Sequence, residues 1–370
     1  MAENINRKIK KIGIINHWQV NNYGALLLAY ALEKTVIKLG YDVETISYLP
    51  DEVKYPWKTS IIKKIGVRTY LMRLFYFMIF IIPRNFSFSN FRSKMVSSNL
   101  VYNDKTISEI KDKYDKIIIG GDQLWNCKIN YYNENNFLPF VKNREKKVVY
   151  AASIAQDKMR EDLADTFKEL ASDFYYITTR EKRATEIIKE IIGINADRVA
   201  DPAFLLSAAE WQSLSDNYDS ITGNFIFVYQ VQSDKELINF AEKLAKDKNC
   251  YIIYCPFPLK KQIKCKRRPY ISPEKWLFYI KNSKYVVTDA FHGTVFSIIF
   301  NRPFFSQISS YGKDTSSRIT NLLEVFSLEN RLLVDGKCDY IDENIDFGRV
   351  NKLIVQERNM SLEHLINMLK

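Results

Sequence analysis

The stretch YVVTDAFHGTVFSIIF, residues 285–300, places one histidine between two apolar runs. Its pattern predicts a strand that ends at Thr288 and a helix that begins near Gly293, with Asp289 and His292 in the turn between them. An imidazole takes up and releases protons near neutral pH, so His292 is a candidate general acid and Asp289 a candidate base. A histidine that only closes this corner through hydrogen bonds is the alternative.

A cationic cluster follows another predicted strand, in ITTREKRATEII. Arg180 comes directly after the strand, and Lys182 and Arg183 fall at the start of the next helix, where cations oppose the helix dipole. Because a guanidinium binds phosphate and carboxylate groups in a bidentate fashion, Arg180 is a candidate clamp for either. A surface salt bridge to Glu181 or Glu186 is the competing interpretation.

A second anion site is predicted downstream, in YGKDTSSRITNLL. Ser317 and Arg318 supply a hydroxyl and a guanidinium there, and this pair favours a functional role for the histidine turn. We assign Gly293 and Thr294, which follow the histidine, to the same anion-binding site.

The segment NNYGA begins a predicted helix near the N-terminus. Gly24 at this position leaves backbone N–H groups available, and such groups suit an anionic ligand. Asn22 and Tyr23 flank this site. The plain alternative is that Asn22 caps the helix, which is compatible with ligand binding.

The segment GGDQLWN follows a buried strand. Two glycines permit a close backbone approach, and Asp122 and Gln123 then project at the strand end, where a carboxylate could accept a proton from a sugar hydroxyl. In the alternative interpretation, this is a tight turn and Trp125 is a packing anchor.

Alternating strands and helices place these residues at strand ends. The sequence opens with an apolar run, a polar turn, an amphipathic segment to about Leu39 and a second apolar run, which predicts a βαβ unit of a parallel sheet. The rhythm restarts after 205–223, so we expect two α/β halves. The predicted units are an N-terminal Rossmann-like domain (1–205), a second Rossmann-like domain (206–350) and a helix that packs back on the body (351–370).

The net charge of +11 is concentrated in two stretches. Residues 58–94 contain eight Lys or Arg and no acid, and residues 260–268 contain six more, which favours a phosphate-rich partner or an anionic membrane face. The apolar run within 58–94 is too short to span a bilayer. It is compatible equally with an interfacial helix and with a core helix. The second stretch lacks the interleaved aromatic residues of a nucleic-acid-binding module, so we expect no nucleic acid partner.

Other kinds of site find little support in the sequence. Five scattered cysteines indicate reduced cytosolic thiols, and three widely spaced histidines without an acidic cluster indicate no metal site. There is no G-x-S-x-G motif and no cysteine beside a histidine. The N-terminus is a poor signal peptide and a good first strand, so we expect a cytoplasmic protein, peripheral at the inner face of the membrane if 58–94 binds lipid.

Taken in order, these segments resemble the motifs of the polysaccharide pyruvyl transferase family. The resemblance is carried by NNYGALLLAYAL, YDKIIIGGDQLWN, YITTREKRA, VADPAFLL, NSKYVVTDAFHGTVFSIIFNRPF and SSRITNLL. It implies two Rossmann-like domains that face each other across a cleft, as in GT-B glycosyltransferases. It also implies transfer of pyruvate from phosphoenolpyruvate to two hydroxyls of one sugar, forming a cyclic ketal and releasing phosphate, without a nucleotide cofactor or a metal.

The resemblance carries over Arg180 and His292, and together with the clusters above it leads us to assign roles to the two halves and their residues. Acceptors in this family are sugars of capsule, exopolysaccharide or wall polymers, often on a lipid diphosphate carrier. The second domain is then the donor side and the first the acceptor side. The expected donor-binding residues are Arg180, Arg318, Ser317, Gly293 and Thr294. The expected acceptor-binding residues are Asn22, Tyr23, Gly24, Gln123 and Trp125, with His292 as acid and Asp122 or Asp289 as base.

One departure from the family pattern bears on the donor. Many members have Arg-Leu-His where this chain has Ala290-Phe291-His292. A cation expected to hold the donor carboxylate is therefore missing there, and Arg318 could replace it. Two other hypotheses remain: a GT-B-like glycosyltransferase that uses a nucleotide sugar, and a non-catalytic scaffold of polymer assembly held at the membrane by 58–94.

Overall fold

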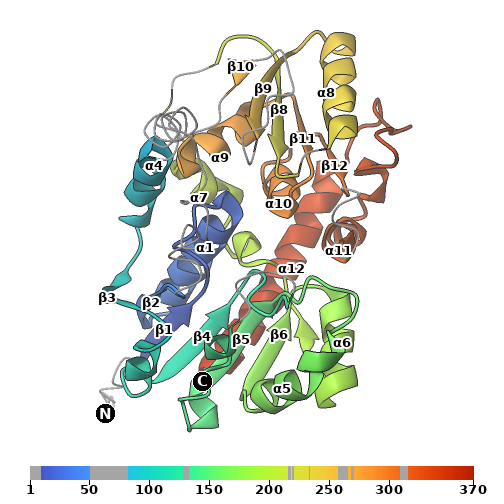
Figure 1. The fold of residues 1–370 in the computed structure, drawn as a ribbon. Coiled ribbons are helices and arrows are strands. Elements are labelled where there is room, and N and C mark those ends of the chain that lie inside the picture. Colours follow the sequence, from blue (N-terminus) through green and yellow to red (C-terminus); the bar gives the residue numbers. More distant parts are fainter. Residues whose placement is uncertain are drawn as a thin grey trace, which may run out of the picture.

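The computed structural model describes residues 10–50, 82–127, 133–215, 218, 221–232, 234–256, 266–267, 271–308 and 316–370. Within these residues the chain forms two parallel sheets, one from each half of the sequence, with helices packed on both (Figure 1). The two sheets lie one above the other in Figure 1. Loops at strand ends of both sheets meet between them. The predicted α/β class is confirmed, with two Rossmann-like domains in a GT-B-like arrangement.

The first domain contains a seven-stranded sheet in the order β3-β2-β1-β4-β5-β6-β7. Its strands are β1 (Lys11–Ile15), β2 (Asp42–Tyr48), β3 (Ser97–Tyr102), β4 (Lys116–Gly120), β5 (Lys147–Ala152), β6 (Tyr176–Thr179) and β7 (Asp197–Arg198). Its helices are α1 (Tyr23–Lys38), α4 (Ile82–Arg92), α5 (Glu161–Ser172) and α6 (Lys182–Ile192).

The second domain contains a six-stranded sheet in the order β10-β9-β8-β11-β12-β13. Its strands are β8 (Phe225–Gln230), β9 (Tyr251–Pro256), β10 (Lys266–Arg267), β11 (Tyr285–Thr288), β12 (Phe304–Gln307) and β13 (Leu332–Leu333). Its helices are α7 (Ala208–Ser213), α8 (Lys235–Asp247), α9 (Pro273–Asn282), α10 (Phe291–Ile299) and α11 (Ser316–Phe326). Short 3₁₀ helices span Ile107–Ile110, Glu134–Phe137, Arg144–Lys146, Pro202–Leu205 and Glu329–Arg331.

The order of the strands fixes where a ligand can bind. In each sheet the chain winds outward in one direction and then in the other, and the direction reverses between β1 and β4 and again between β8 and β11. Loops diverge at such a reversal and leave a crevice at the carboxyl ends of the two strands. The two crevices therefore hold the loops after β1, β4, β8 and β11.

Local sequence signals explain how the helices begin. Asn22 caps α1 by accepting a hydrogen bond from Ala25 N, as expected. Ser207 and Glu210 form the predicted capping box at α7. The helix α10 begins at Phe291, two residues earlier than expected, because Ala290 takes the N-cap position. The imidazole of His292 thus projects from the first turn of a helix and not from the turn before it.

The two glycines after β4 let α1 pack directly on that strand. A Cβ atom on Gly120 would lie 2.4 Å from a methyl group of Leu32, and one on Gly121 equally close to a methyl group of Leu28. Gly121 and Asp122 both have positive φ angles, 65° and 53°, so the chain turns sharply here. This turn carries the Asp122 side chain to the strand end.

An aromatic core joins the two domains. Tyr23 of α1 stacks on Trp276 of α9, with ring centroids 5.4 Å apart and nearly parallel planes. Phe88 of α4 lies 5.0 Å from the Tyr23 ring, and all three side chains are buried in one cluster with residues of α10. In Figure 1, α1 and α4 of the first domain accordingly lie beside α9 of the second.

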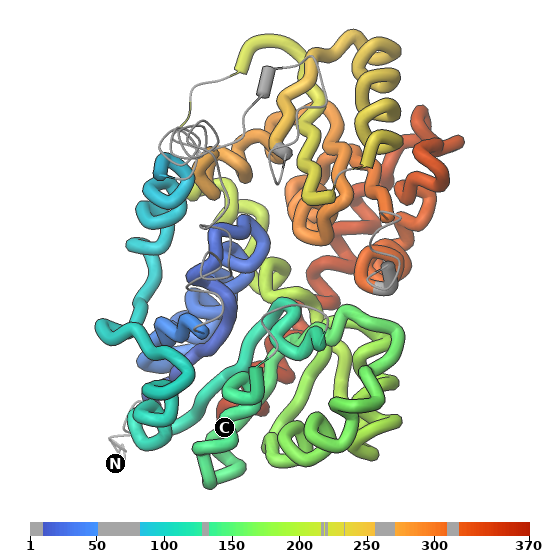
Figure 2. Tube along the Cα trace, in the orientation of Figure 1, coloured from blue at the N-terminus to red at the C-terminus, as the bar shows by residue number. Residues whose placement is uncertain are grey.

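The last helix, α12 (Phe347–Leu369), crosses from the second domain to the first (Figures 1 and 2). Near its start, Val350 and Ile354 join the cluster that contains α10 and α11. Near its end, Leu365 and Met368 pack against the first sheet. The residues expected as a C-terminal helix, 351–370, lie within it except for Lys370, which follows its last residue.

The basic segment 58–94 is only partly within the described residues. Its apolar run from Leu71 to Ile82 lies outside them except for Ile82 itself. The described end is α4, which buries Phe88 and Phe91 in the interdomain core and exposes Phe86. Of the helices in the described ranges, none is long and apolar enough to cross a membrane.

Candidate active site

A cavity of about 450 Å³ lies between the two domains, where both crevices meet. The first domain contributes residues between His17 and Ala25, together with Asp122 and Gln123 after β4. The second contributes Tyr229, Val231 and Gln232 at and after β8 and the run 289–292 after β11. Two arginines complete the lining, Arg84 from α4 and Arg318 from α11. The sequence prediction that strand ends from both halves converge is therefore confirmed.

His292 reaches across the gap between the domains. Its ring lies against the start of α1 so closely that a Cβ atom on Gly24 would be 2.0 Å from His292 Nδ1 and 2.4 Å from Cγ. The other nitrogen, Nε2, lies 3.4 Å from Oδ2 of Asp201. Gly24 thus serves to admit the imidazole, and the ring occupies the space beside the helix start that we had assigned to an anion.

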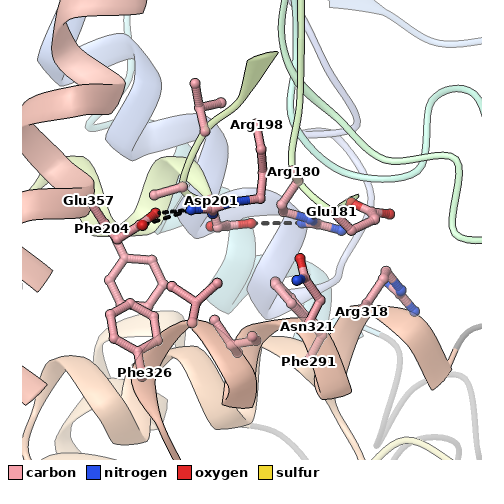
Figure 3. Close-up of a pocket in the computed structure, with 14 residues that line it drawn as sticks. Arg180, Glu181, Arg198, Asp201, Phe204, Phe291, Arg318, Asn321, Phe326 and Glu357 are labelled. Carbon is pink, nitrogen blue, oxygen red and sulfur yellow. Dashed lines mark hydrogen bonds and ion pairs between the residues drawn. The ribbon is translucent and has the colours of Figure 1, made fainter. Parts of the chain in front are cut away.

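The same oxygen atom of Asp201 faces both Arg180 and His292. Arg180 Nη1 donates to Asp201 Oδ2 over 2.7 Å, as Figure 3 shows. Ala203 N donates to Oδ1 over 2.9 Å. Burial alone would raise the pKa of Asp201, but His292, Arg180 and the Ala203 N–H hold it well below its ordinary value. Asp201 is therefore an anion that only accepts hydrogen bonds.

Arg180 is buried and already paired. Besides Asp201, it lies 3.6 Å from Glu181, whose Oε1 accepts from the hydroxyl of Ser153. Burial favours the neutral form, but the carboxylates of Asp201 and Glu181 outweigh it and raise the pKa of Arg180. Arg180 does not line the 450 Å³ cavity; it lines a small pocket of about 20 Å³ behind it (Figure 3). The predicted contact with Glu181 exists, although it is buried rather than on the surface.

The ring of Phe291 lies near both arginines expected to bind the donor. The guanidinium carbon of Arg180 lies 4.3 Å from the ring centroid, and that of Arg318 lies 5.8 Å from it. Burial and repulsion by Arg180 lower the pKa of Arg318 to about 10. With the Gln123 amide oriented so that its oxygen faces the guanidinium, Gln123 accepts from Arg318 at 2.5 and 2.9 Å. Arg318 is thus the cavity-facing member of the pair.

Asp122 and His17 both line the first domain's side of the cavity. Both line the cavity, and burial lowers the pKa of His17, while the nearby Asp122 opposes this shift. The imidazole of His17 is therefore neutral at pH 7. Asp122 is only partly buried, so its carboxylate is open to a ligand.

Asp289 holds two loops together. Its carboxylate accepts from the backbone N–H groups of Val231 (2.6 Å) and Gln232 (2.8 Å). Burial raises the pKa of Asp289 to about 7, against the effect of these two bonds. Because both oxygens are engaged by the backbone, the predicted base at this position has no oxygen directed at a ligand alone.

The comparisons with known proteins give the family of the chain. The family described as "Polysaccharide pyruvyl transferase" matches residues 22–306, which include the loops after β1, β4, β8 and β11 from Asn22 onward. The chain belongs to the polysaccharide pyruvyl transferase family. A comparison with curated proteins finds no match.

Solved structures share the fold of this family member. The UDP-GlcNAc 2-epimerase from Methanocaldococcus jannaschii has a TM-score of 0.53 at 12% identity, over 94% of this chain and 93% of that one. The M. jannaschii enzyme in complex with UDP-GlcNAc and UDP has a TM-score of 0.50 at the same identity and coverage. The E. coli ADP-heptose LPS heptosyltransferase II has a TM-score of 0.37 at 12% identity, over 94% and 99% of the two chains. At 12% identity the two M. jannaschii likenesses show the fold alone.

Two aromatic residues expected to bind the acceptor belong to the core instead. Trp125 is fully buried, and its ring stacks on Phe137 at 5.3 Å. The hydroxyl of Tyr23 donates to the carbonyl of Ile271 within the interdomain core. Neither side chain lines the cavity, so the packing alternative is correct for Trp125 and also describes Tyr23.

The predicted roles of two other donor-binding residues are corrected, and a third residue lies outside what the structure describes. Thr294 is buried and shares a hydrogen bond of 2.6 Å with Ser306, away from the cavity. Gly293 is required because a Cβ atom there would lie 2.4 Å from the hydroxyl of Thr288. Its role is therefore the packing of α10 on β11. The side chain of Ser317 lies outside what the structure describes.

Three further residues of the site were not predicted from the sequence. Asp201 sits in the motif VADPAFLL, and an Asp-Pro pair directly after a strand was the available signal. His17 follows the first strand, as the other candidates follow theirs. Arg84 is brought to the cavity from α4, and nothing in its local sequence predicts that contact. Among the described residues, no group of three His, Cys, Asp or Glu side chains could hold a metal ion.

Proposed function

We propose that this protein transfers the pyruvyl group of phosphoenolpyruvate to two hydroxyls of one sugar of a surface polysaccharide or its lipid-linked precursor, forming a cyclic ketal. The observation that carries the proposal is the position of His292. Within a chain of the polysaccharide pyruvyl transferase family, the histidine lines a cavity built from the strand ends of both domains. This cavity has room for a small donor and a sugar ring.

The donor brings a phosphate and a carboxylate into the cavity, and cations of this chain face it. Arg318 and Arg84 both line the cavity, from different domains. Ala290, at the position where many family members have arginine, also lines it, so an arginine there would point at the same space that Arg318 reaches. This supports Arg318 as the replacement cation. Arg180 acts on the donor only indirectly, through its bond to Asp201.

The chemistry proceeds by addition and then displacement at the same carbon. His292 gives a proton to the methylene carbon of the donor as the first sugar hydroxyl forms a bond to the neighbouring carbon and loses its proton. The bond from that carbon to the phosphate oxygen then breaks, and the second hydroxyl takes its place. One hydroxyl proton balances the new methyl C–H bond, and the other leaves with the phosphate.

Asp122 is the better candidate for the base on the acceptor. Its carboxylate lines the cavity on the first domain, opposite His292 on the second. Asp289, the other candidate, has both carboxylate oxygens bound by backbone N–H groups. We assign the hydroxyl proton to Asp122 and a structural role to Asp289.

An acceptor on a lipid diphosphate carrier would bring the protein to the inner face of the membrane. Ile82 and Phe86 of α4 are 49% and 66% exposed, and Arg84 of the same helix lines the cavity. Exposed apolar side chains on α4 suit a bilayer surface. Sedimentation with vesicles should be greater with anionic lipid than with neutral lipid, and binding that ignores both lipid charge and salt would refute this part.

A nucleotide-sugar glycosyltransferase is the second candidate, favoured by one observation. A protein of similar fold was solved with UDP-GlcNAc and UDP. Binding of a nucleotide sugar but not of phosphoenolpyruvate, measured by calorimetry, would favour this candidate.

The test of the first proposal is direct. The purified protein is incubated with phosphoenolpyruvate and a panel of lipid-linked or model glycosides, and phosphate release and product mass are followed. We expect stoichiometric phosphate release and one pyruvyl ketal with an active glycoside, and no turnover in a folded His292→Ala variant. Full activity of that variant would remove the proposed acid.

A further inference from the structure

We propose that Asp201 is a positioning residue that fixes the proton of His292 on Nε2, so that Nδ1 is the atom through which His292 exchanges a proton with the ligand. The inference rests on the proposed function only for the identity of that ligand. The arrangement of Asp201, His292 and Gly24 carries the rest.

The hydrogen-bonding partners of Asp201 leave one assignment for the imidazole. Its Oδ2 atom, an acceptor only, faces Arg180 Nη1 at 2.7 Å and His292 Nε2 at 3.4 Å. An unprotonated Nε2 would place a lone pair against a buried carboxylate, which is repulsive. Nε2 therefore carries hydrogen in both the neutral and the cationic ring.

The second nitrogen then becomes the reactive one. In the neutral ring, the lone pair lies on Nδ1, and in the cationic ring Nδ1 holds the proton that can leave. This nitrogen lies against Gly24, in the wall that His292 and Gly24 share along the cavity. Nε2 is buried and 3.4 Å from Asp201, without a hydrogen bond that meets the usual geometry to any described residue, and catalytic hydrogen bonds often tighten only when a ligand binds.

Arg180 gives this pair its stability. Asp201 would be an isolated buried charge without the guanidinium, and Ala203 N fixes the orientation of its carboxylate through Oδ1. The three side chains therefore form a chain from Arg180 through Asp201 to His292. In this series Arg180 acts on the imidazole through Asp201 and needs no contact with the donor.

The first test uses the unmodified protein. The full chain, labelled with ¹⁵N at its three histidines, is studied by long-range ¹H–¹⁵N correlation, and the His292 signals are assigned by their loss in His292→Gln. We expect the neutral ring to carry hydrogen on Nε2 alone. Hydrogen on Nδ1, or a mixture of both forms, would overturn the assignment whether or not the protein is a pyruvyl transferase.

The second test asks whether Asp201 is responsible. Asp201→Asn replaces a charged acceptor by a neutral one of the same shape, which weakens the attraction of this oxygen for the Nε2 proton. We expect the Nε2 proton resonance to move upfield. Glu357→Gln is the matched control, because it neutralises a carboxylate that pairs with Arg198 at 2.7 Å and lines the small pocket but not the 450 Å³ cavity that His292 lines. An unchanged resonance in folded Asp201→Asn would refute the role of Asp201.

Kinetics separate positioning from simple support of the fold. A general acid contributes about 10²–10⁴-fold to a rate, so Asp201→Asn should lower kcat by about 10²-fold while KM stays within a few-fold. Equal kcat in the variant and the wild type would contradict the proposal. If the wild type shows no pyruvyl transfer, the proposed function fails, and the two NMR results still decide the proton assignment.

Discussion

Substitution of Gly24 by alanine tests the contact between the domains on which the site depends. The new Cβ atom would lie 2.0 Å from His292 Nδ1, whereas non-bonded atoms settle at about 3.5 Å. The imidazole must therefore move by about 1.5 Å. A misplacement of about 1 Å can cost about 10²-fold in rate, so we expect kcat/KM to fall by at least that factor.

The fold should tolerate this substitution, because Gly24 is the second residue of α1 and alanine favours a helix by about 1 kcal/mol. Gly348→Ala provides a matched control: it is the second residue of α12, is exposed, and lies away from the cavity. The assay compares phosphate release and thermal unfolding in both variants. Activity of Gly24→Ala within about threefold of the control would show that the ring is not needed where the structure places it, and would refute the argument.

Three other substitutions test separate parts of the site. Burial raises the pKa of Asp289 to about 7, so its contribution to the free energy of unfolding is complete below about pH 4 and is lost as the pH rises through 7, by at most about 4 kcal/mol. Asp289→Asn should flatten the pH dependence of urea unfolding over this range, and an unchanged pH dependence would contradict the assignment. Trp125→Ala should lower the free energy of unfolding by about 3–5 kcal/mol, whereas a loss of acceptor affinity at unchanged stability would restore its binding role. Arg180→Ala should lower the free energy of unfolding by about 3–5 kcal/mol because it leaves buried carboxylates unpaired, while Arg318→Ala should mainly raise KM for the donor. The reverse pattern in thermal unfolding and kinetics would exchange the roles of the two arginines.

Local signals in the sequence account for the elements and their ends. Asn22 and Ser207 cap helices as expected, since capping depends on residues within one turn. The glycines after β4 indicated that another part of the protein approaches this backbone closely, and the structure shows that α1 does so. The position of His292 at a strand end followed from the same periodic pattern.

Contacts between distant segments were beyond the sequence. Arg180 looked like a free clamp because Asp201, its partner, lies 21 residues away and is brought to it by the sheet. The sequence suggested that Gly24 offers its backbone N–H groups to a ligand, whereas the structure shows that a glycine is needed there to leave room for the His292 ring of the other domain. For Trp125, binding and packing predict the same residue type, and only burial separates them.

The fate of the methylene carbon tests the central claim most directly. The protein is incubated in deuterated water with phosphoenolpyruvate labelled with ¹³C and an active glycoside, and the product is examined by NMR. We predict a ketal carbon next to a methyl group that contains one deuterium atom, in the wild type but not in His292→Ala. A product without the ketal carbon, or a ketal formed equally by both proteins, would contradict this account.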